Sequence, residues 1–264
     1  MNKIYIGTTP PELPKGGYLY IHDHIPDIPR SRVFDPKAHS FNPLQQLTYR
    51  RASDLVEIFD ALFSRGDSTL TKDTGLDYIA EALEGSPASL EALIPRPDKK
   101  SSTGHIWAYG KVQRLLRSPV LKDMLCKRTN FSFNSNSVIL ARISRAELGD
   151  FDALAIGQFL MAHYKGQVVV PDFGFYGRGA HVSLIRENRL IGGVRFLGEL
   201  PDRLRDSVLL IEDKTVAGAL YDDAVLLAKY AGHIPDRLRA ENAYQAYIEA
   251  ATRRPGDEPE HDTA

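Results

Sequence analysis

The most constraining feature of the sequence is an apolar run that ends in a proline and a carboxylate. Residues 167–176 read QVVVPDFGFY, so three valines are followed at once by Pro171 and Asp172. Val168 to Val170 predict a strand that is buried on both faces, as in a parallel sheet. Asp172 then falls just past the carboxyl end of that strand, where open α/β sheets place their ligands. The stretch therefore predicts an α/β protein with Asp172 near a binding site.

Composition narrows the class of protein without identifying a function. The chain has 264 residues, of which 43% are hydrophobic and 25% charged, as in an ordinary globular protein. Its net charge of −1 gives no general attraction to nucleic acid, so such binding would need a local patch. The single cysteine, Cys126, excludes a disulfide framework and a cysteine-based zinc site. With no apolar run long enough for a membrane span and no signal-peptide h-region, we expect a cytoplasmic protein.

Hydrophobic periodicity divides the chain into four parts. Residues 1–50 are rich in proline and turn residues, and we assign them as N-terminal strands of an α/β core. Residues 51–130 show helical spacing and form a helical insertion, whose first helix we expect to be capped by Ser53. Residues 131–252 return to the α/β core, and residues 253–264 have the composition of a disordered tail.

Strands and helices alternate in the second half, which favours a parallel, doubly wound sheet. The strands of the whole chain are expected at 18–21, 32–34, 138–143, 168–170, 193–197 and 208–211. The helices are expected at 53–66, 77–83, 88–94, 111–116, 120–126, 150–163, 181–190, 202–205, 222–230 and 242–251. Between the first two strands, Pro26 and Pro29 forbid a helix.

Three signatures, in this order, resemble the FtsK/HerA/TraG-type P-loop ATPases, the hexameric pumps that move DNA. The first is VFDPK at 33–37 with NPL at 42–44. The second is VILARI at 138–143, followed by a long helix. The third is the Val168–Asp172 strand, followed by LIRENR at 184–189 and GVRFL at 193–197. The likeness covers about residues 17–232. It implies an α/β fold with a RecA-like three-layer sheet, into which residues 51–130 insert as a helical subdomain.

The resemblance implies a relict nucleotide or metal site at Asp172, Asp35 and Lys37. The sequence departs from the family in the parts that hydrolyse ATP. No glycine-rich turn with Gly-Lys-Ser/Thr lies between the first two core strands, although such a turn cradles the phosphates. Phe173 stands where the family has an acid, and Glu199 lies where a polar sensor, often glutamine, is usual. Because phosphoryl transfer depends on positioning and charge stabilisation, we expect no ATP hydrolysis by the chain alone. No cofactor is required, and binding of Mg-ATP stays an open alternative.

Basic residues near the central strand suggest two further roles within that resemblance. Arg186 and Arg189 are three apart, so on a helix they would share a face and could act in trans on a neighbouring subunit's nucleotide. Lys165, Tyr176, Arg178 and Arg195 are candidates for contacts with nucleic acid. The alternative, which we favour for these basic residues, is a solvated face balanced by acidic neighbours such as Glu187 and Asp202.

The resemblance therefore implies a catalytically degenerate relative of the DNA pumps. It would act as a binding or assembly subunit of a DNA-processing or DNA-transfer machine. Such a subunit would be oligomeric and would have a protein partner, such as an active ATPase paralogue. Two alternatives stay open: an ATPase subunit completed by a P-loop from a separate chain, and a nucleic-acid-binding module without nucleotide.

Several smaller motifs have simpler interpretations. Residues 66–73 approach the P-loop spacing, but Thr71 replaces its second glycine, so we interpret them as a loop between helices. His22 and His24 could converge on a metal, yet no third ligand is near, which favours a surface pair. Asp172 could hold Mg²⁺, or it could only cap the next helix. Cys126 lies in an apolar stretch and is expected to be a buried structural thiol.

Overall fold

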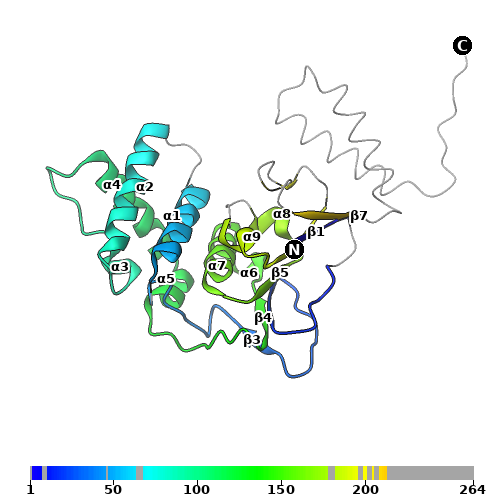
Figure 1. Cartoon of the computed structure of the whole chain (residues 1–264). Coiled ribbons are helices and arrows are strands. Elements are labelled where there is room, and N and C mark those ends of the chain that lie inside the picture. Colours follow the sequence, from blue (N-terminus) through cyan, green and yellow to red (C-terminus); the bar gives the residue numbers. More distant parts are fainter. Residues whose placement is uncertain are drawn as a thin grey trace, which may run out of the picture. The chain divides into compact units, whose positions relative to one another are not determined.

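The computed structural model describes residues 2–7, 11–45, 47–63, 68–177, 182–195, 199–200, 204 and 208–212 (Figure 1). The chain divides into two compact units, residues 1–211 and 212–264. All the helices and strands described below belong to the first unit, except for Glu212, the last residue of the last strand. Within the described residues, no helix is long and apolar enough to cross a membrane.

A parallel sheet forms the centre of the first unit. Its strands lie in the order β3-β4-β2-β5-β6-β1-β7. Every neighbouring pair from β3 to β1 is parallel. At the far edge, the Leu209 amide donates a hydrogen bond of 2.9 Å to the Asn2 carbonyl and joins β7 to the sheet. The strands are β1 (Lys3–Ile6), β2 (Tyr18–His22), β3 (Arg32–Phe34), β4 (Val138–Arg142), β5 (Gln167–Val170), β6 (Leu190–Val194) and β7 (Leu209–Glu212).

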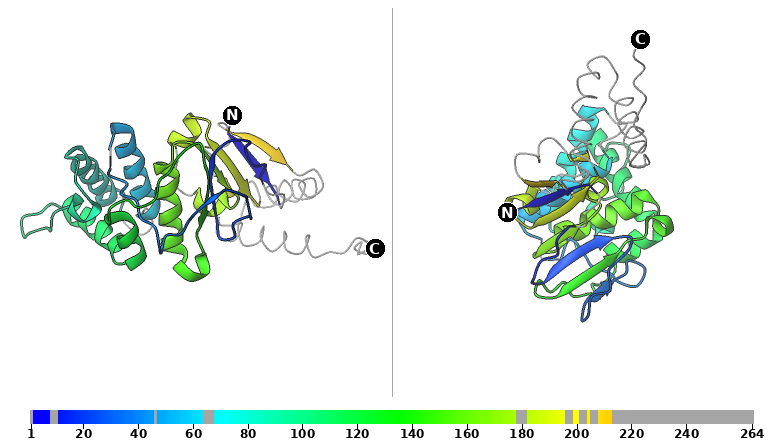
Figure 2. Two further views of the ribbon diagram at one scale, coloured as in Figure 1. Left: turned by 90° about the horizontal axis from the view of Figure 1, so that it is seen from below. Right: turned by 90° about the vertical axis from the view of Figure 1, so that its right-hand side faces the viewer.

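The helices fall into two groups along the chain. In the described part of the segment between β3 and β4 there are five helices, and α7 separates them from the sheet in Figure 2. They are α1 (Tyr49–Phe63), α2 (Thr69–Glu84), α3 (Leu90–Leu93), α4 (Thr103–Leu116) and α5 (Pro119–Cys126). The other described helices are α6 (Arg145–Leu148), α7 (Asp150–His163), α8 (Phe173–Tyr176) and α9 (Val182–Arg186).

Side-chain alternation along the strands divides the apolar core into two clusters. Leu19 and Ile21 of β2 point to the main cluster, which also holds the buried residues of the helices. Tyr18 and Val169 belong to a smaller cluster on the other face, to which no described helix contributes. A third layer over that face therefore stays a prediction. The helical segment and the sheet share one continuous core, and its correspondence to an inserted subdomain is likewise untested.

The parallel α/β arrangement and most element positions are confirmed. β2, β3, β4, β5 and β7 lie within one residue of their predicted ranges. Residues 23–31 cross from β2 to β3 without a helix, as the prolines predicted. The helix predicted at 111–116 is present as α4, but it begins at Thr103.

Several boundaries were predicted wrongly. α1 begins at Tyr49 rather than after Ser53, because the Thr48 hydroxyl accepts a hydrogen bond of 3.3 Å from the Arg51 amide. α2 begins at Thr69, where Ser68 caps it, so the second half of the P-loop-like stretch is helical rather than a loop. β6 begins at Leu190, and the helix before it shortens to α9. β1, α6 and α8 were not predicted, since four-residue elements carry too little periodicity to be recognised.

The predicted helices at 222–230 and 242–251, and the tail at 253–264, lie outside the described residues, as do Arg178 and Gly66. Of the helix predicted at 202–205, only Leu204 is described.

Candidate functional site at the two edges of the sheet

The strand order places a switch point between β2 and β5. These two strands pair directly, with Leu19 opposite Val168. The chain leaves β2 toward β3 on one side and leaves β5 toward β6 on the other. Ligands of open α/β sheets bind where neighbouring connections diverge, outside the carboxyl ends of the strands. Asp23 follows β2 at this point and Asp172 follows β5, so the sequence placed Asp172 correctly.

An arginine from α6 occupies the space beside Asp172. Nη1 of Arg145 donates a hydrogen bond of 3.0 Å to Oδ2 of Asp172, and its Nε lies 3.3 Å from Oδ1 of Asp150. The guanidinium also stacks over Phe175, with 4.1 Å from its carbon to the ring centroid. Asp172 makes no side-chain cap bond to α8, so the capping role is wrong. Its carboxylate is instead neutralised by an internal cation.

Asp35 and Lys37 lie at the same carboxyl edge, and both are paired. Oδ1 of Asp35 accepts a bond of 2.9 Å from the Lys37 amide, and Oδ2 accepts one of 2.6 Å from Arg142. Burial by itself would raise the pKa of Asp35, but these two donors outweigh it and lower the pKa. The Lys37 ammonium forms an ion pair with Glu147 and lowers the pKa of that carboxyl.

The carboxyl edge thus holds a row of ion pairs joined by one short helix. Arg145 and Glu147 both come from α6, and they reach Asp172 on one side and Lys37 on the other. Among the described residues, the Asp172 carboxylate faces a guanidinium, which does not fit coordination of Mg²⁺ by that side chain. Within the described ranges, no group of three His, Cys, Asp or Glu side chains could hold a metal.

His22, the last residue of β2, and His24 form a local turn rather than a metal site. Nδ1 of His22 accepts a hydrogen bond of 3.0 Å from the His24 amide, and the two rings meet edge to face at 6.1 Å. Cys126 is half-buried, and burial raises the pKa of its thiol, as expected for a structural cysteine.

Tyr176 cannot stack on a nucleotide in this structure, which corrects its predicted role. The residue is 1% exposed, and its ring packs against Gly157, where an added Cβ would lie 2.3 Å from the ring. Burial raises the pKa of the Tyr176 hydroxyl, and the charges of Asp23 and Asp172 raise it further. The ring instead fills the space between α7 and α8.

Arg195 also lies at the carboxyl edge, directly after β6. Its Nε donates a hydrogen bond of 2.8 Å to Oε1 of Glu199. The Glu199 carboxylate in turn packs against Gly174 of α8, where a Cβ would meet Oε2 at 2.4 Å. Sequence reasoning did not foresee this pair.

The remaining basic candidates that the structure describes lie at the opposite, amino edge. Arg189 precedes β6, and its Nη1 donates to the carbonyls of Tyr164 at 2.6 Å and Gly166 at 3.2 Å. The Arg189 side chain is 13% exposed and also pairs with Glu187. Arg186 is exposed at the end of α9, and Arg189 lies beyond that helix. The prediction that these arginines share a helix face is therefore wrong. Arg189 instead connects the start of β6 to the chain before β5 through its hydrogen bonds.

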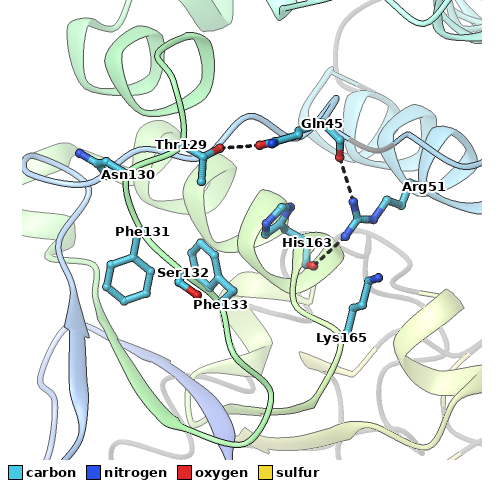
Figure 3. Close-up of a pocket in the computed structure, with 9 residues that line it drawn as sticks. All are labelled: Gln45, Arg51, Thr129, Asn130, Phe131, Ser132, Phe133, His163 and Lys165. Atoms are coloured by element: carbon cyan, nitrogen blue, oxygen red, sulfur yellow. Dashed lines mark hydrogen bonds between the residues drawn. The ribbon is translucent and has the colours of Figure 1, made fainter.

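Lys165 lies beside a pocket that the sequence did not reveal. The pocket has a volume of about 590 Å³ and is lined by residues 129–133, by Gln45 and Arg51 around the start of α1, and by His163 and Lys165 (Figure 3). The exposed Lys165 comes just before β5, and Asp172 comes just after it. Because strands rise about 3.3 Å per residue, the two residues are roughly 20 Å apart and belong to different sites.

Aromatic rings and a neutral histidine form one wall of this pocket. Phe133 and His163 meet edge to face at 5.2 Å, and Phe131 lies 5.0 Å from Phe133. Burial, together with the nearby charges of Arg51 and Lys165, lowers the pKa of His163 to about 4. His163 is therefore neutral at pH 7, and its buried Nδ1 has no hydrogen-bond partner.

We compared the chain with protein families, curated proteins and solved structures. No protein-family model matches the chain, and no curated protein or solved structure is significantly similar to it.

Proposed function

We propose that this chain is a non-hydrolysing relative of the FtsK/HerA/TraG-type DNA pumps that serves as a binding or assembly subunit of a DNA-processing machine. The RecA-like character of its parallel sheet, its oligomerisation and its cytoplasmic location belong to the same proposal. Support comes from the position of Asp172 after a central strand, next to the point where the chain connections diverge.

The observation that carries the proposal is the ion pair between Arg145 and Asp172. A carboxylate that coordinates Mg²⁺ for phosphoryl transfer has to face the metal. Here it accepts a hydrogen bond of 3.0 Å from a guanidinium that also pairs with Asp150 and stacks on Phe175. A metal ion would have to displace an arginine held by three contacts, so the arrangement favours a structural role.

The connection from β2 to β3 supports the same conclusion. In the pump family this connection would carry the phosphate-binding loop and its helix. Residues 23–31 instead form bends and turns with no helix, and no Gly-Lys-Ser/Thr occurs there. This connection therefore offers no glycine-rich turn whose backbone amides could surround a phosphate.

Calorimetry with Mg-ATP, together with a phosphate-release assay, tests the non-hydrolysing part. We expect no hydrolysis by the purified chain and no binding at the carboxyl edge. Asp172→Asn is the matched variant, since it keeps the shape and removes the charge. Hydrolysis by the wild type that disappears in Asp172→Asn would overturn the proposal.

The subunit part is tested by adding an intact P-loop ATPase that co-purifies with the chain. An assembly subunit leaves the chain's own edge inactive but changes the partner's ATPase rate. Arg186→Gln tests a contribution in trans, because Arg186 is the exposed arginine of the predicted pair. If hydrolysis instead depended on Asp172 within the complex, the split ATPase would be the better description.

A further inference from the structure

The pocket at the amino edge carries charge of one sign. Arg51 and Lys165 line it, and no Asp or Glu is among the described lining residues. Asp54 acts electrostatically on Arg51, but it does not line the pocket. Figure 3 shows Arg51 and Lys165 on the same side of His163. Two cations that converge on a concave surface favour an anionic ligand.

Arg51 is fixed in place before any ligand arrives. Its Nη1 donates a hydrogen bond of 3.1 Å to the Gln45 carbonyl, and its Nη2 lies 3.5 Å from the His163 carbonyl. Half-burial lowers the pKa of Arg51, yet a guanidinium stays charged at any physiological pH. A pre-oriented guanidinium loses little entropy when it binds a phosphate oxygen.

The side chain of Lys165 is less constrained than that of Arg51. It is exposed, and no described residue forms an ion pair with it. An ammonium on a flexible stem beside a fixed guanidinium can close on a phosphate from a second direction. The pair thus combines one rigid and one adaptable cation.

The opposite wall offers a surface for a planar ring. Phe133 is half-buried, so part of its ring faces the pocket, and Phe131 and His163 support it from behind and from the side. Aromatic faces bind nucleobases by stacking, with little dependence on sequence. The buried Nδ1 of His163, beside this wall, has no hydrogen-bond partner among the described residues.

Polar groups close the upper side. The Thr129 hydroxyl donates a hydrogen bond of 2.9 Å to Oε1 of Gln45 and accepts one of 3.0 Å from the Asn42 amide. These two bonds orient the Gln45 side chain. With its oxygen occupied, the Gln45 amide presents its NH₂ group as a donor. A volume of about 590 Å³ lies within the range of small-molecule sites.

We propose that this pocket binds one nucleotide unit, with its phosphate between Arg51 and Lys165 and its base against Phe133. The unit is either a free nucleotide or one residue of a single-stranded nucleic acid. The site lies at the opposite edge from Asp172, so the proposal goes beyond the assembly role and does not depend on pump ancestry.

Fluorescence anisotropy and calorimetry on the full chain test the site. The probes are AMP without Mg²⁺, labelled (dT)12, a 12-base-pair duplex and inorganic phosphate. We expect Lys165→Gln to weaken AMP or (dT)12 binding roughly tenfold. Lys99→Gln, an exposed lysine in the loop before α4, is the matched control and should change nothing. Phe133→Leu should weaken nucleotide binding but leave phosphate binding unaffected.

The probes separate the two sources of the ligand. AMP binding that equals (dT)12 binding indicates a free nucleotide, whereas binding of (dT)12 alone indicates a strand. For a strand, the Lys165 variant should also reduce the salt slope by about 0.7. The proposal is overturned if no probe binds at millimolar concentration, if duplex binds as well as single strand, or if Lys165→Gln and Lys99→Gln behave alike. None of these outcomes depends on ATP hydrolysis, so failure here leaves the assembly proposal intact.

Discussion

The two edges of the sheet both gather charged side chains, but they use them differently. At the carboxyl edge, Asp35, Lys37, Asp172 and Arg195 each have an internal ion-pair partner. At the amino edge, Arg51 and Lys165 line a pocket into which no described carboxylate projects. A charged residue at the expected place in a fold is therefore not enough to mark a site. What matters is whether carboxylates of the protein share the same surface with it.

The largest effect should follow from removing the aromatic support behind the pocket. Phe34 is fully buried and lies 5.2 Å from Phe131 and 5.5 Å from Phe133. We expect Phe34→Ala to lower the free energy of unfolding by about 3–5 kcal/mol in urea denaturation, because it leaves a cavity. Val33→Ala is the control, since Val33 on the same strand is 42% exposed and should cost less than about 0.5 kcal/mol. Equal effects at both positions would contradict this packing.

The amino edge should also make stability depend on pH. The folded protein keeps His163 neutral down to about pH 4, whereas the unfolded chain takes up the proton near pH 6.5. Below pH 6.5 the unfolded state therefore binds more protons than the folded state. The contribution of neutral His163 to the free energy of unfolding is complete above pH 6.5 and is lost as the pH falls toward 4. At pH 5 the loss should be about 2 kcal/mol. Denaturant unfolding at pH 7 and pH 5 measures it, and His163→Gln should flatten the difference. A variant with the wild-type dependence would rule out His163 as the cause.

At the carboxyl edge, breaking the central ion pair should cost stability. Arg145→Gln leaves Asp172, whose side chain is 27% exposed, without its cation. Allowing for this partial exposure, we expect a loss of about 1–2 kcal/mol by thermal or urea unfolding. Lys165→Gln at the amino edge should change stability by less than about 0.5 kcal/mol while it weakens ligand binding. If Lys165→Gln destabilised the protein as much as Arg145→Gln, the contrast between the edges would fail.

The smallest effect is expected from the outer pair of the carboxyl edge. Lys37 and Glu147 are both exposed, so water and salt screen their attraction. A double-mutant cycle with Lys37→Gln and Glu147→Gln should give a weaker coupling than the Arg145–Asp172 pair. That coupling should vanish in about 1 M salt. A coupling that persisted in salt would mean that α6 holds both pairs as a single rigid network.

The sequence by itself determined the class of the fold and its central landmark. Three consecutive valines before Pro171 and Asp172 required a buried parallel strand with a carboxylate at its end, and the prolines before β3 excluded a helix there. These features depend on neighbouring residues, so local patterns are enough to predict them. The longer helices were also found from periodicity, although their first turns depended on caps such as Thr48 and Ser68.

Only the tertiary structure decided which charges are available. Arg145 lies 27 residues before Asp172, and no spacing rule connects them. The pocket is formed by the start of α1, the α5–β4 connection and the end of α7, which are far apart in the chain. The basic residues near β5 looked like one group in the sequence, yet Lys165 precedes β5 at the amino edge and Arg195 follows β6 at the carboxyl edge. Pairing and concavity depend on distances through space, and a linear sequence does not contain those distances.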